Sequence, residues 1–327
     1  MASTMRAVGI QGGKGPATSL FIDTIAKPAP APGQALVKIR AFGLNRMDLL
    51  QREGVYPVPP QAPATMGVEF SGVVEGFGGD EPCDFKVGDE VFGLAYGDGW
   101  WEMGLLIYEG DIGAYAEYLA VSTKMLMHKP KDLSWEEAAG VPETWITASQ
   151  ALFLIGDFQE GQSVLWHAGA SSVSISGIQL AKAAGAKAIY ATAGSQEKID
   201  FLEKELGVTK AFNYRTEDWA TEIQRATGGA GVNLTVDFIG ATYFQGNLDV
   251  AARDGRVVLL GLMGGGKLPD GVNIAPLLMK RIRVGGQHAA QPGRGVPAEI
   301  AGHAGVACTA AILRWHVPCV CGEGIPV

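Results

Sequence analysis

Cysteine, clustered positive charge and long apolar runs are scarce in this sequence, and each shortage excludes a class of protein. Only Cys83 precedes the last twenty residues, so the chain has no disulfide framework. The net charge is -8 and the basic residues cluster only in the short run from Lys280 to Arg283, which argues against nucleic acid as a partner. No stretch of about 18 uncharged apolar residues occurs, and the first ten residues lack the apolar segment of a secretory signal. We therefore expect a cytoplasmic protein that does not span a membrane.

The chain has 327 residues, a length that suits two domains, and its pattern of apolar residues changes near residue 141. Up to about residue 141, short apolar runs are cut by Gly and Pro, a pattern typical of an irregular β-rich barrel or sandwich. From Pro142 on, short aliphatic runs alternate with helical periods, which predicts an α/β domain with a parallel, doubly wound sheet. The predicted strands there are 163–166, 188–192, 211–213, 234–239 and 256–260, and the predicted helices are 143–154, 175–184, 195–207, 218–226 and 243–252.

A turn of small residues joins the first of these strands to the first helix after it. Backbone N–H groups in such a turn can approach a pyrophosphate, and the helix N-terminus adds a partial positive charge. The strict glycine fingerprint is absent, because Ser172 and Ser174 occupy two of the glycine places. A tight turn without a ligand is the alternative, and His167 is interpreted as a packed residue. The predicted nucleotide-binding residues of this turn are Gly169, Ser171, Ser172, Val173 and Ser174.

Several ordered motifs carry a resemblance to one family. They are Asn45–Asp48, Gln51–Pro57, Gly67–Glu69, Pro142–Ala148, the turn just described, Thr192–Lys198, Phe212–Tyr214 and Gly261–Gly266. Together they resemble the zeta-crystallin-like NADPH:quinone oxidoreductases of the medium-chain dehydrogenase/reductase superfamily, particularly the p53-inducible quinone oxidoreductase subgroup. The resemblance covers roughly residues 5 to 284 and is interrupted once.

The resemblance implies a GroES-like catalytic barrel followed by a Rossmann domain, with NADPH bound at the carboxyl ends of the sheet and the active site between the domains. We place the catalytic domain at 1–141 and the Rossmann domain at 142–284. Asn45 is then expected near the nicotinamide and Tyr56 near the substrate, with Thr147, Gly261 and Met263 contacting the cofactor. The alternatives for Asn45 and Tyr56 are a local turn and a packed loop residue. The resemblance also implies a possible homodimer that forms through the Rossmann domain.

The zinc enzymes of the superfamily carry a Cys near the position of Asn45 and a His in the motif 67–69, and this sequence has neither. A catalytic zinc needs three protein ligands, and Glu69 alone does not supply them. The structural zinc site of the superfamily uses four cysteines, where this chain offers only Cys83. The sequence therefore predicts a barrel without a metal.

The end of the second predicted strand favours NADPH over NADH. NAD-binding domains usually place an Asp or Glu there, about 20 residues after the glycine loop, and this chain has the run Thr192–Ser195 instead. Ser195 can present its hydroxyl and nearby N–H groups to a 2′-phosphate, and by resemblance Lys198 and Tyr214 grip it. Glu197 could oppose the phosphate. The alternatives are a solvated lysine and an ordinary aromatic residue at a strand end.

These features predict a metal-free reduction of quinones or related α,β-unsaturated carbonyl compounds with NADPH. Hydride transfer to a quinone depends mainly on orientation, because the product oxygens can take protons from water. One alternative is a 2-enoyl thioester reductase that uses Tyr56 as proton donor. The other is a truncated nucleotide-binding protein with impaired catalysis.

That last alternative comes from two departures from the family. Residues 97–112 form an apolar insert, and the tail 285–327 lacks the helices and strands that close the barrel in relatives. We hypothesise an unspliced segment and a shifted reading frame; a genuine substrate lid and a disordered natural tail are the alternatives. A metal site in the tail, formed by Cys308, His316, Cys319 and Cys321, is disfavoured because no ordered scaffold is predicted around it.

Overall fold

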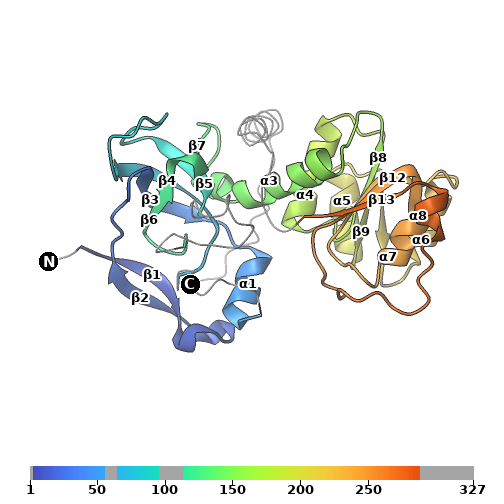
Figure 1. Ribbon diagram of the computed structural model, residues 1–327, viewed down its shortest axis with the longest axis horizontal. Coiled ribbons are helices and arrows are strands. Elements are labelled where there is room, and N and C mark those ends of the chain that lie inside the picture. The colour runs from blue at the N-terminus through green and yellow to red at the C-terminus, as the bar shows by residue number, and fades with distance from the viewer. Residues whose placement is uncertain (1–2, 56–64, 96–112, 288–327) are drawn as a thin grey trace. The chain divides into compact units, whose positions relative to one another are not determined.

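The structure, a computed structural model, describes residues 3–55, 65–95 and 113–287. These residues form two compact units, the first ending at Glu143 and the second beginning at Thr144 (Figure 1). Tyr56, the whole insert at 97–112 and the tail from residue 288 lie outside the described residues. What the sequence suggested for them remains a prediction.

The first unit is built from antiparallel strands. Five of them form one sheet in the order β6-β3-β4-β5-β7, and β1 pairs separately with β2. The strands are β1 (Thr4–Ile10), β2 (Leu20–Ala26), β3 (Gln34–Phe42), β4 (Glu69–Phe77), β5 (Glu90–Leu94), β6 (Tyr118–Ser122) and β7 (Leu126–His128); the helices are α1 (Arg46–Glu53) and α2 (Trp135–Ala139). The expected β-rich architecture is confirmed.

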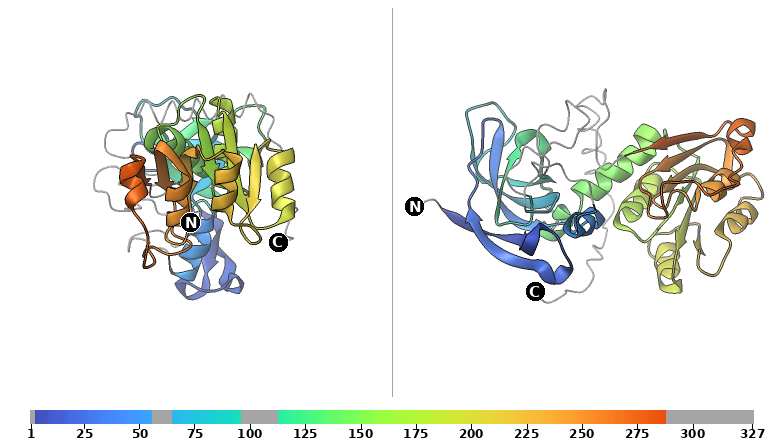
Figure 2. Two further views of the ribbon diagram at one scale, coloured as in Figure 1. Left: turned by 90° about the vertical axis from the view of Figure 1, so that its right-hand side faces the viewer. Right: turned by 60° about the horizontal axis from the view of Figure 1, so that its bottom comes forward.

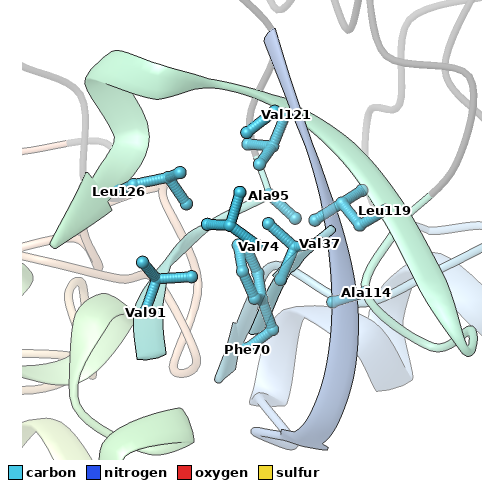
Figure 3. Close-up of a cluster of buried hydrophobic side chains, with 10 residues drawn as sticks. Val37, Phe70, Val74, Val91, Ala95, Ala114, Leu119, Val121 and Leu126 are labelled. Atoms are coloured by element: carbon cyan, nitrogen blue, oxygen red, sulfur yellow. The ribbon is translucent and has the colours of Figure 1, made fainter. Parts of the chain in front are cut away.

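A single apolar cluster holds the five-stranded sheet together (Figure 3). Alternate residues of β3, Ala35 and Val37, are fully buried, as expected for a strand with one face on a core. Phe70 on β4 and Leu119 on β6 pack into the same cluster. Because β3 pairs with both of these strands, the cluster fixes the register of the central part of the sheet.

The β1–β2 ribbon, dark blue in Figure 2, lies beside helix α1. The N–H group of Gly15, in the turn between the two strands, donates to the carbonyl of Arg52 at 2.8 Å, and Arg52 Nε donates to the carbonyl of Gly15 at 3.2 Å. Helix α1 ends at Gly54, whose φ of 73° is the left-handed conformation that favours glycine. The two contacts therefore fix the end of α1, whose N-cap is Asn45.

The second unit contains the predicted doubly wound sheet. Six parallel strands lie in the order β10-β9-β8-β11-β12-β13. They are β8 (Ser163–Trp166), β9 (Ala188–Ala193), β10 (Lys210–Asn213), β11 (Val232–Asp237), β12 (Ala251–Leu259) and β13 (Arg283–Gly286); the helices are α3 (Pro142–Ser149), α4 (Ser172–Ala183), α5 (Gln196–Lys204), α6 (Trp219–Ala226), α7 (Phe244–Val250) and α8 (Ala275–Met279). This α/β architecture confirms the expected fold class.

Helices cover both faces of this sheet (Figure 1). Leu165 of β8 belongs to the cluster that contains Trp219 and Ile223 of α6. Trp166, the next residue, faces Gly177 of α4, where an added Cβ atom would lie 2.0 Å from the indole ring. Since successive residues of a strand point to opposite faces, α4 and α6 lie on opposite sides of the sheet.

The structure corrects three details of the expected element order. The long helix expected at 143–154 is α-helical only to Ser149, and residues Gln150–Ile155 continue it as a π-helix. Helix α4 begins at Ser172, earlier than expected. Strand β13 was not predicted, because its two glycines resemble a loop rather than a strand. Among the described residues, none of the helices is both long and apolar enough to cross a membrane.

The contact between α4 and β8 gives a test of packing in the second unit. Gly177→Ala should destabilise the protein by about 1–3 kcal/mol, because the added methyl group collides with Trp166 in a close-packed interior. In an uncrowded helix the same change would stabilise by about 1 kcal/mol. Urea unfolding measures the difference, with Gly286→Ala as the control, since a Cβ atom there meets no atom closer than 3.9 Å. Equal stability of Gly177→Ala and wild type would contradict the packing.

Candidate functional site

The carboxyl edge of the parallel sheet brings together the loops that carry the predicted cofactor residues. Strands β8 to β12 all run in the same direction, so the loops after them leave the sheet at one edge. The chain order reverses between β8 and β11, which are neighbours in the sheet. Open α/β sheets bind ligands in the crevice at such a point. The edge therefore places the residues after β8, β9, β10 and β12 around one possible binding site.

The turn after β8 has the donors that a pyrophosphate requires. Ser171 is the N-cap of α4, and its Oγ accepts the N–H of Ser174 at 3.3 Å. The Ser174 hydroxyl in turn donates to the carbonyl of His167 at 3.0 Å. Within the described residues, the N–H groups of Ser172 and Val173 donate to no recorded acceptor. These two groups open a helix of 12 residues and can bind an anion.

Gly169 is required for the close packing of this turn. An added Cβ atom would lie 2.8 Å from Cβ of Ala191 in β9 and 3.0 Å from a methyl group of Leu202 in α5. Ala168 before it has a φ of 48°, a conformation that is strained for a residue with a side chain. The Gly169 N–H donates to the carbonyl of Thr192 at 2.8 Å. The turn is thus held against β9 while its neighbouring donors stay free.

Donors also gather where β9 and β10 end. Ser195 is the N-cap of α5, and its Oγ accepts the Lys198 N–H at 3.4 Å, while the Lys198 side chain is exposed. A Cβ atom at Gly194 would lie 2.6 Å from the Tyr214 hydroxyl oxygen and 3.2 Å from Arg215 Nε. Tyr214 and Arg215 therefore fold back over Gly194, next to the start of α5. Arg215 was not predicted from the sequence; its position directly after Tyr214 was the available signal.

The loop after β12 packs against the loop after β11. The Met263 N–H donates to the carbonyl of Phe238 at 3.1 Å, and its side chain is 63% exposed. A Cβ atom at Gly261 would lie 3.0 Å from the same carbonyl oxygen, so this position has no room for a larger residue. Both predicted residues therefore lie at the carboxyl edge, with the Met263 side chain available to a ligand.

Thr147 is buried in α3 with an unused polar atom. Its side chain is 7% exposed, and its Oγ1 has no hydrogen-bond partner among the described residues. Its backbone carbonyl accepts Gln287 Nε2 at 3.3 Å. Buried hydroxyl groups are generally hydrogen-bonded, so this one fits the predicted contact with a ligand.

A buried network of hydrogen bonds joins the strand ends from which the loops of the carboxyl edge leave the sheet. His167 Nδ1 lies 3.0 Å from Thr192 Oγ1, and its Nε2 lies 2.8 Å from Asn247 Oδ1. Asn247 Nδ2 donates to Asp237 Oδ2 at 2.8 Å, and Asp237 Oδ1 accepts the N–H of Ile239 at 2.6 Å. Complete burial lowers the pKa of His167. A neutral, fully bonded imidazole agrees with the interpretation of His167 as a packed residue.

In the first unit, Asn45 joins a buried carboxyl group. Asn45 is half-buried, and its Nδ2 donates to Glu69 Oε1 at 2.8 Å. The other oxygen of Glu69 accepts the N–H of Glu143, at the start of α3, at 2.9 Å. A Cβ atom at Gly43 would lie 2.1 Å from Glu69 Oε1, so glycine makes room for the carboxyl group.

A second buried carboxylate, Asp48, fixes the backbone of the same turn. Its Oδ2 accepts the Asn45 N–H at 2.7 Å and the Tyr115 hydroxyl at 2.7 Å. Tyr115 packs on Phe42 with ring centroids 4.6 Å apart. Gly67, with a φ of 99°, lets the chain pass beside the tyrosine ring, where a Cβ atom would come within 2.4 Å. Sequence reasoning missed Asp48 and Tyr115, since they meet only in the folded sheet.

Burial changes the acid–base behaviour of this cluster. Desolvation raises the pKa of Glu69 to about 8, against the opposing effect of the Glu143 N–H and Asn45 hydrogen bonds. Desolvation also raises the pKa of Asp48, while the hydrogen bonds from Tyr115 and Asn45 lower it. The pKa of Tyr115 is raised by burial and by the neighbouring Asp48 charge. The cluster therefore holds protons more tightly than exposed carboxyl groups do.

The part of the chain that the structure describes contains no group of three or more His, Cys, Asp or Glu side chains arranged to bind a metal ion. Asn45 and Val68 stand in the turn and in the motif 67–69 where, by the resemblance noted above, the zinc enzymes carry a Cys and a His; Val68 is buried at 2% exposure.

Two family models match the chain, one in each unit. Residues 31–131 match the alcohol dehydrogenase GroES-like domain. Residues 172–299 match the zinc-binding dehydrogenase family.

Curated relatives include dehydrogenase-like and quinone reductase proteins. A zinc-type alcohol dehydrogenase-like protein of Schizosaccharomyces pombe is 32% identical over 76% of this chain and 74% of its own length. The human quinone oxidoreductase is 29% identical over 80% of this chain and 74% of its own length. The synaptic vesicle membrane protein VAT-1 homolog of Danio rerio is 32% identical over 72% of this chain, which spans 45% of that relative.

The chain is also similar to solved structures of dehydrogenases and reductases. An NAD-dependent alcohol dehydrogenase is 31% identical with a TM-score of 0.80, over 94% of this chain and 90% of that one. A mycobacterial protein in complex with NADPH is 26% identical with a TM-score of 0.76, over 96% and 90%. The CurK enoyl reductase is 25% identical with a TM-score of 0.73, over 95% and 88%.

The raised pKa of Glu69 predicts how stability depends on pH. Between the ordinary pKa of 4.5 and about 8, the folded state holds a proton on Glu69 that the unfolded state has lost. The free energy of unfolding should therefore fall as pH rises through this window, by up to roughly 1.4 kcal/mol per pH unit. Glu69→Gln removes this titration. The stability of wild type relative to the variant, measured by urea unfolding from about pH 5 to about pH 9, should decline and then level off. A difference that is independent of pH would contradict the prediction.

Proposed function

This chain belongs to the medium-chain dehydrogenase/reductase family, and from that premise we propose that it uses NADPH to reduce quinones or related α,β-unsaturated carbonyl compounds without a metal ion. The similarity to quinone oxidoreductases supports an oxidoreductase. The observation that carries the choice of cofactor is the end of β9, where a lysine, a tyrosine and an arginine gather and no carboxylate terminates the strand.

The 2′-phosphate of NADPH fits this group of residues. Lys198 and Arg215 supply positive charge, and Tyr214 supplies a hydroxyl group beside Gly194, whose lack of a side chain makes room for the tyrosine and the arginine. Ser195 adds its hydroxyl group at the start of α5. An Asp or Glu at this strand end would instead select the ribose hydroxyls of NADH. Glu197 is exposed on α5 and is the one opposing charge within the first turn.

The pyrophosphate fits the start of α4. The N–H groups of Ser172 and Val173 provide donors at the positive end of the helix dipole. Gly169 keeps the turn close to the sheet. Thr147 offers its unused Oγ1, and Gly261 and Met263 lie on the loop after β12, so we assign them to the rest of the cofactor.

The chemistry then rests on orientation. Bound NADPH supplies a hydride, and the protein must hold the acceptor beside it. We assign Asn45 to the nicotinamide end of the site and Tyr56 to the substrate end. Oxygens of a reduced quinone can take protons from water, so a tuned general acid is not required.

Reduction of a 2-enoyl thioester is the second candidate, supported by the similarity to an enoyl reductase. That reaction needs a proton at carbon as well as the hydride, and Tyr56 is the candidate donor. The two functions therefore differ in their dependence on one hydroxyl group.

Steady-state turnover tests the proposal. The purified chain should oxidise NADPH with quinones or enones as acceptors, and the rate should survive incubation with a strong zinc chelator. Turnover confined to enoyl thioesters and lost in Tyr56→Phe would establish the second candidate. Loss of activity on chelation, restored by zinc, would overturn the metal-free reaction, and absence of any NADPH oxidation would leave a nucleotide-binding protein with impaired catalysis.

Removing one cation should change the cofactor preference. A lost charge-assisted contact costs on the order of 1.5–3 kcal/mol, so Lys198→Ala should lower kcat/KM for NADPH roughly tenfold or more and leave that for NADH nearly unchanged. Arg215→Ala should act in the same direction. Lys204→Ala is the matched control, since Lys204 lies on the same helix and pairs with Asp200 at 2.7 Å. Equal losses with both cofactors would defeat the assignment, as would a wild-type preference for NADH.

A further inference from the structure

The most unusual group outside the cofactor edge is Glu69, a carboxyl group that is 1% exposed and touches the side chain of Asn45. Burying a carboxyl group costs free energy even when it is hydrogen-bonded. The turn at the start of α1 does not need it, because Asp48 already accepts the Asn45 N–H. A role for Glu69 beyond closing this turn must therefore be sought in the groups that it contacts.

Glu69 contacts two hydrogen-bond donors, one of which is fixed in the backbone while the other can rotate. The Glu143 N–H belongs to the backbone at the start of α3 and cannot turn. The Asn45 side chain can rotate its amide by half a turn, which exchanges its oxygen and nitrogen. In its ionised form the carboxyl group accepts from both donors at once, one on each oxygen. It thereby holds the Asn45 amide with nitrogen toward Glu69 and oxygen away from it.

We propose that Glu69 is a positioning residue for the reaction, which fixes the orientation of the Asn45 amide and so determines which of its atoms meets the bound ligand. The proposal rests on the function assigned to Asn45 above. It requires Asn45 Oδ1, which faces the Asp48 N–H in the capping box of α1, to accept a second hydrogen bond from a donor group of a ligand, such as the amide nitrogen of a nicotinamide. The close approach of Gly43 and Glu69 shows that the site is built around the carboxyl group.

Glutamine at position 69 should reverse this orientation. Its single carbonyl oxygen can satisfy only one of the two donors, and the backbone N–H of Glu143 is the one that cannot move. The Gln amide nitrogen then faces Asn45, which must turn its own oxygen inward. Because Gln has nearly the same shape as Glu, the change alters the polarity of the contact more than the packing.

A double-mutant cycle on kcat tests the proposal, at a pH above the Glu69 pKa of about 8 so that the carboxyl group is ionised. We expect Asn45→Ala to lower kcat about tenfold and Glu69→Gln to lower it by a similar factor. In the Asn45→Ala background, Glu69→Gln should lower kcat less than about twofold further, because there is no amide left to orient. Glu75→Gln is the control: Glu75 lies on the same strand, pairs with Lys27 at 3.0 Å, and should leave kcat unchanged.

Each of the other possible results of the double-mutant cycle contradicts a specific part of the proposal. If the two losses multiply in the double variant, Glu69 acts independently of Asn45 and the positioning role is wrong. If Asn45→Ala leaves kcat unchanged while NADPH-dependent turnover persists, both the positioning role and the assignment of Asn45 are wrong, whereas the reductase function stands. Circular dichroism and thermal unfolding check folding. If Glu69→Gln fails to fold, Glu69→Asp replaces it in the cycle, since the shorter side chain keeps the carboxyl group but cannot reach the Asn45 amide and the Glu143 N–H together.

Discussion

Parallel pairing of β8 with β9 and β11 is the constraint on which the candidate cofactor site depends. The loops that follow parallel strands all lie at one edge of the sheet. Residues more than 90 positions apart in the sequence, such as Gly169 and Met263, therefore lie at the same edge although they do not touch each other. The buried network from Thr192 through His167 and Asn247 to Asp237 then ties the ends of three strands and helix α7 together. The edge is thereby fixed before a ligand arrives, which lowers the entropic cost of binding.

The sequence predicted this half of the molecule well because its signals are local. Strand β8 was predicted with its observed bounds, and Ser195 was recognised as the cap of α5, since both depend on a few consecutive residues. Strand β13 was missed because its pairing with β12 stabilises a segment ending in two glycines, which have little strand propensity of their own. Arg215 was missed for a related reason: its place beside Gly194 arises from the pairing of β9 with β10.

The polar cluster of the first unit could not be read from the sequence in the same way. Asn45 was singled out by resemblance, but Glu69 was considered only as a lone carboxylate that cannot by itself hold a zinc ion. Its actual partners, Asn45 and the Glu143 N–H, lie 24 and 74 residues away. Tyr115 and Asp48 are 67 residues apart. Contacts of this kind depend on sheet register and on glycines such as Gly67 that permit close approach, and neither leaves a periodic signal in the sequence.

Five buried side-chain polar atoms have no partner among the described residues. Three of them carry no ligand assignment, namely Trp166 Nε1, Thr235 Oγ1 and Gln287 Oε1. One further atom in each unit lies at or next to a position assigned to ligand binding. In the second unit it is Thr147 Oγ1, and in the first it is Asp48 Oδ1, on the carboxylate that holds Asn45. An unpaired buried oxygen costs free energy comparable to a lost hydrogen bond, so both atoms mark places where the fold alone does not satisfy its own donors and acceptors. A hydroxyl group can donate or accept, whereas an ionised carboxylate only accepts. The pattern therefore suits a ligand that presents a donor to the Asn45 turn, which is the polarity that the Glu69 contact imposes on the amide.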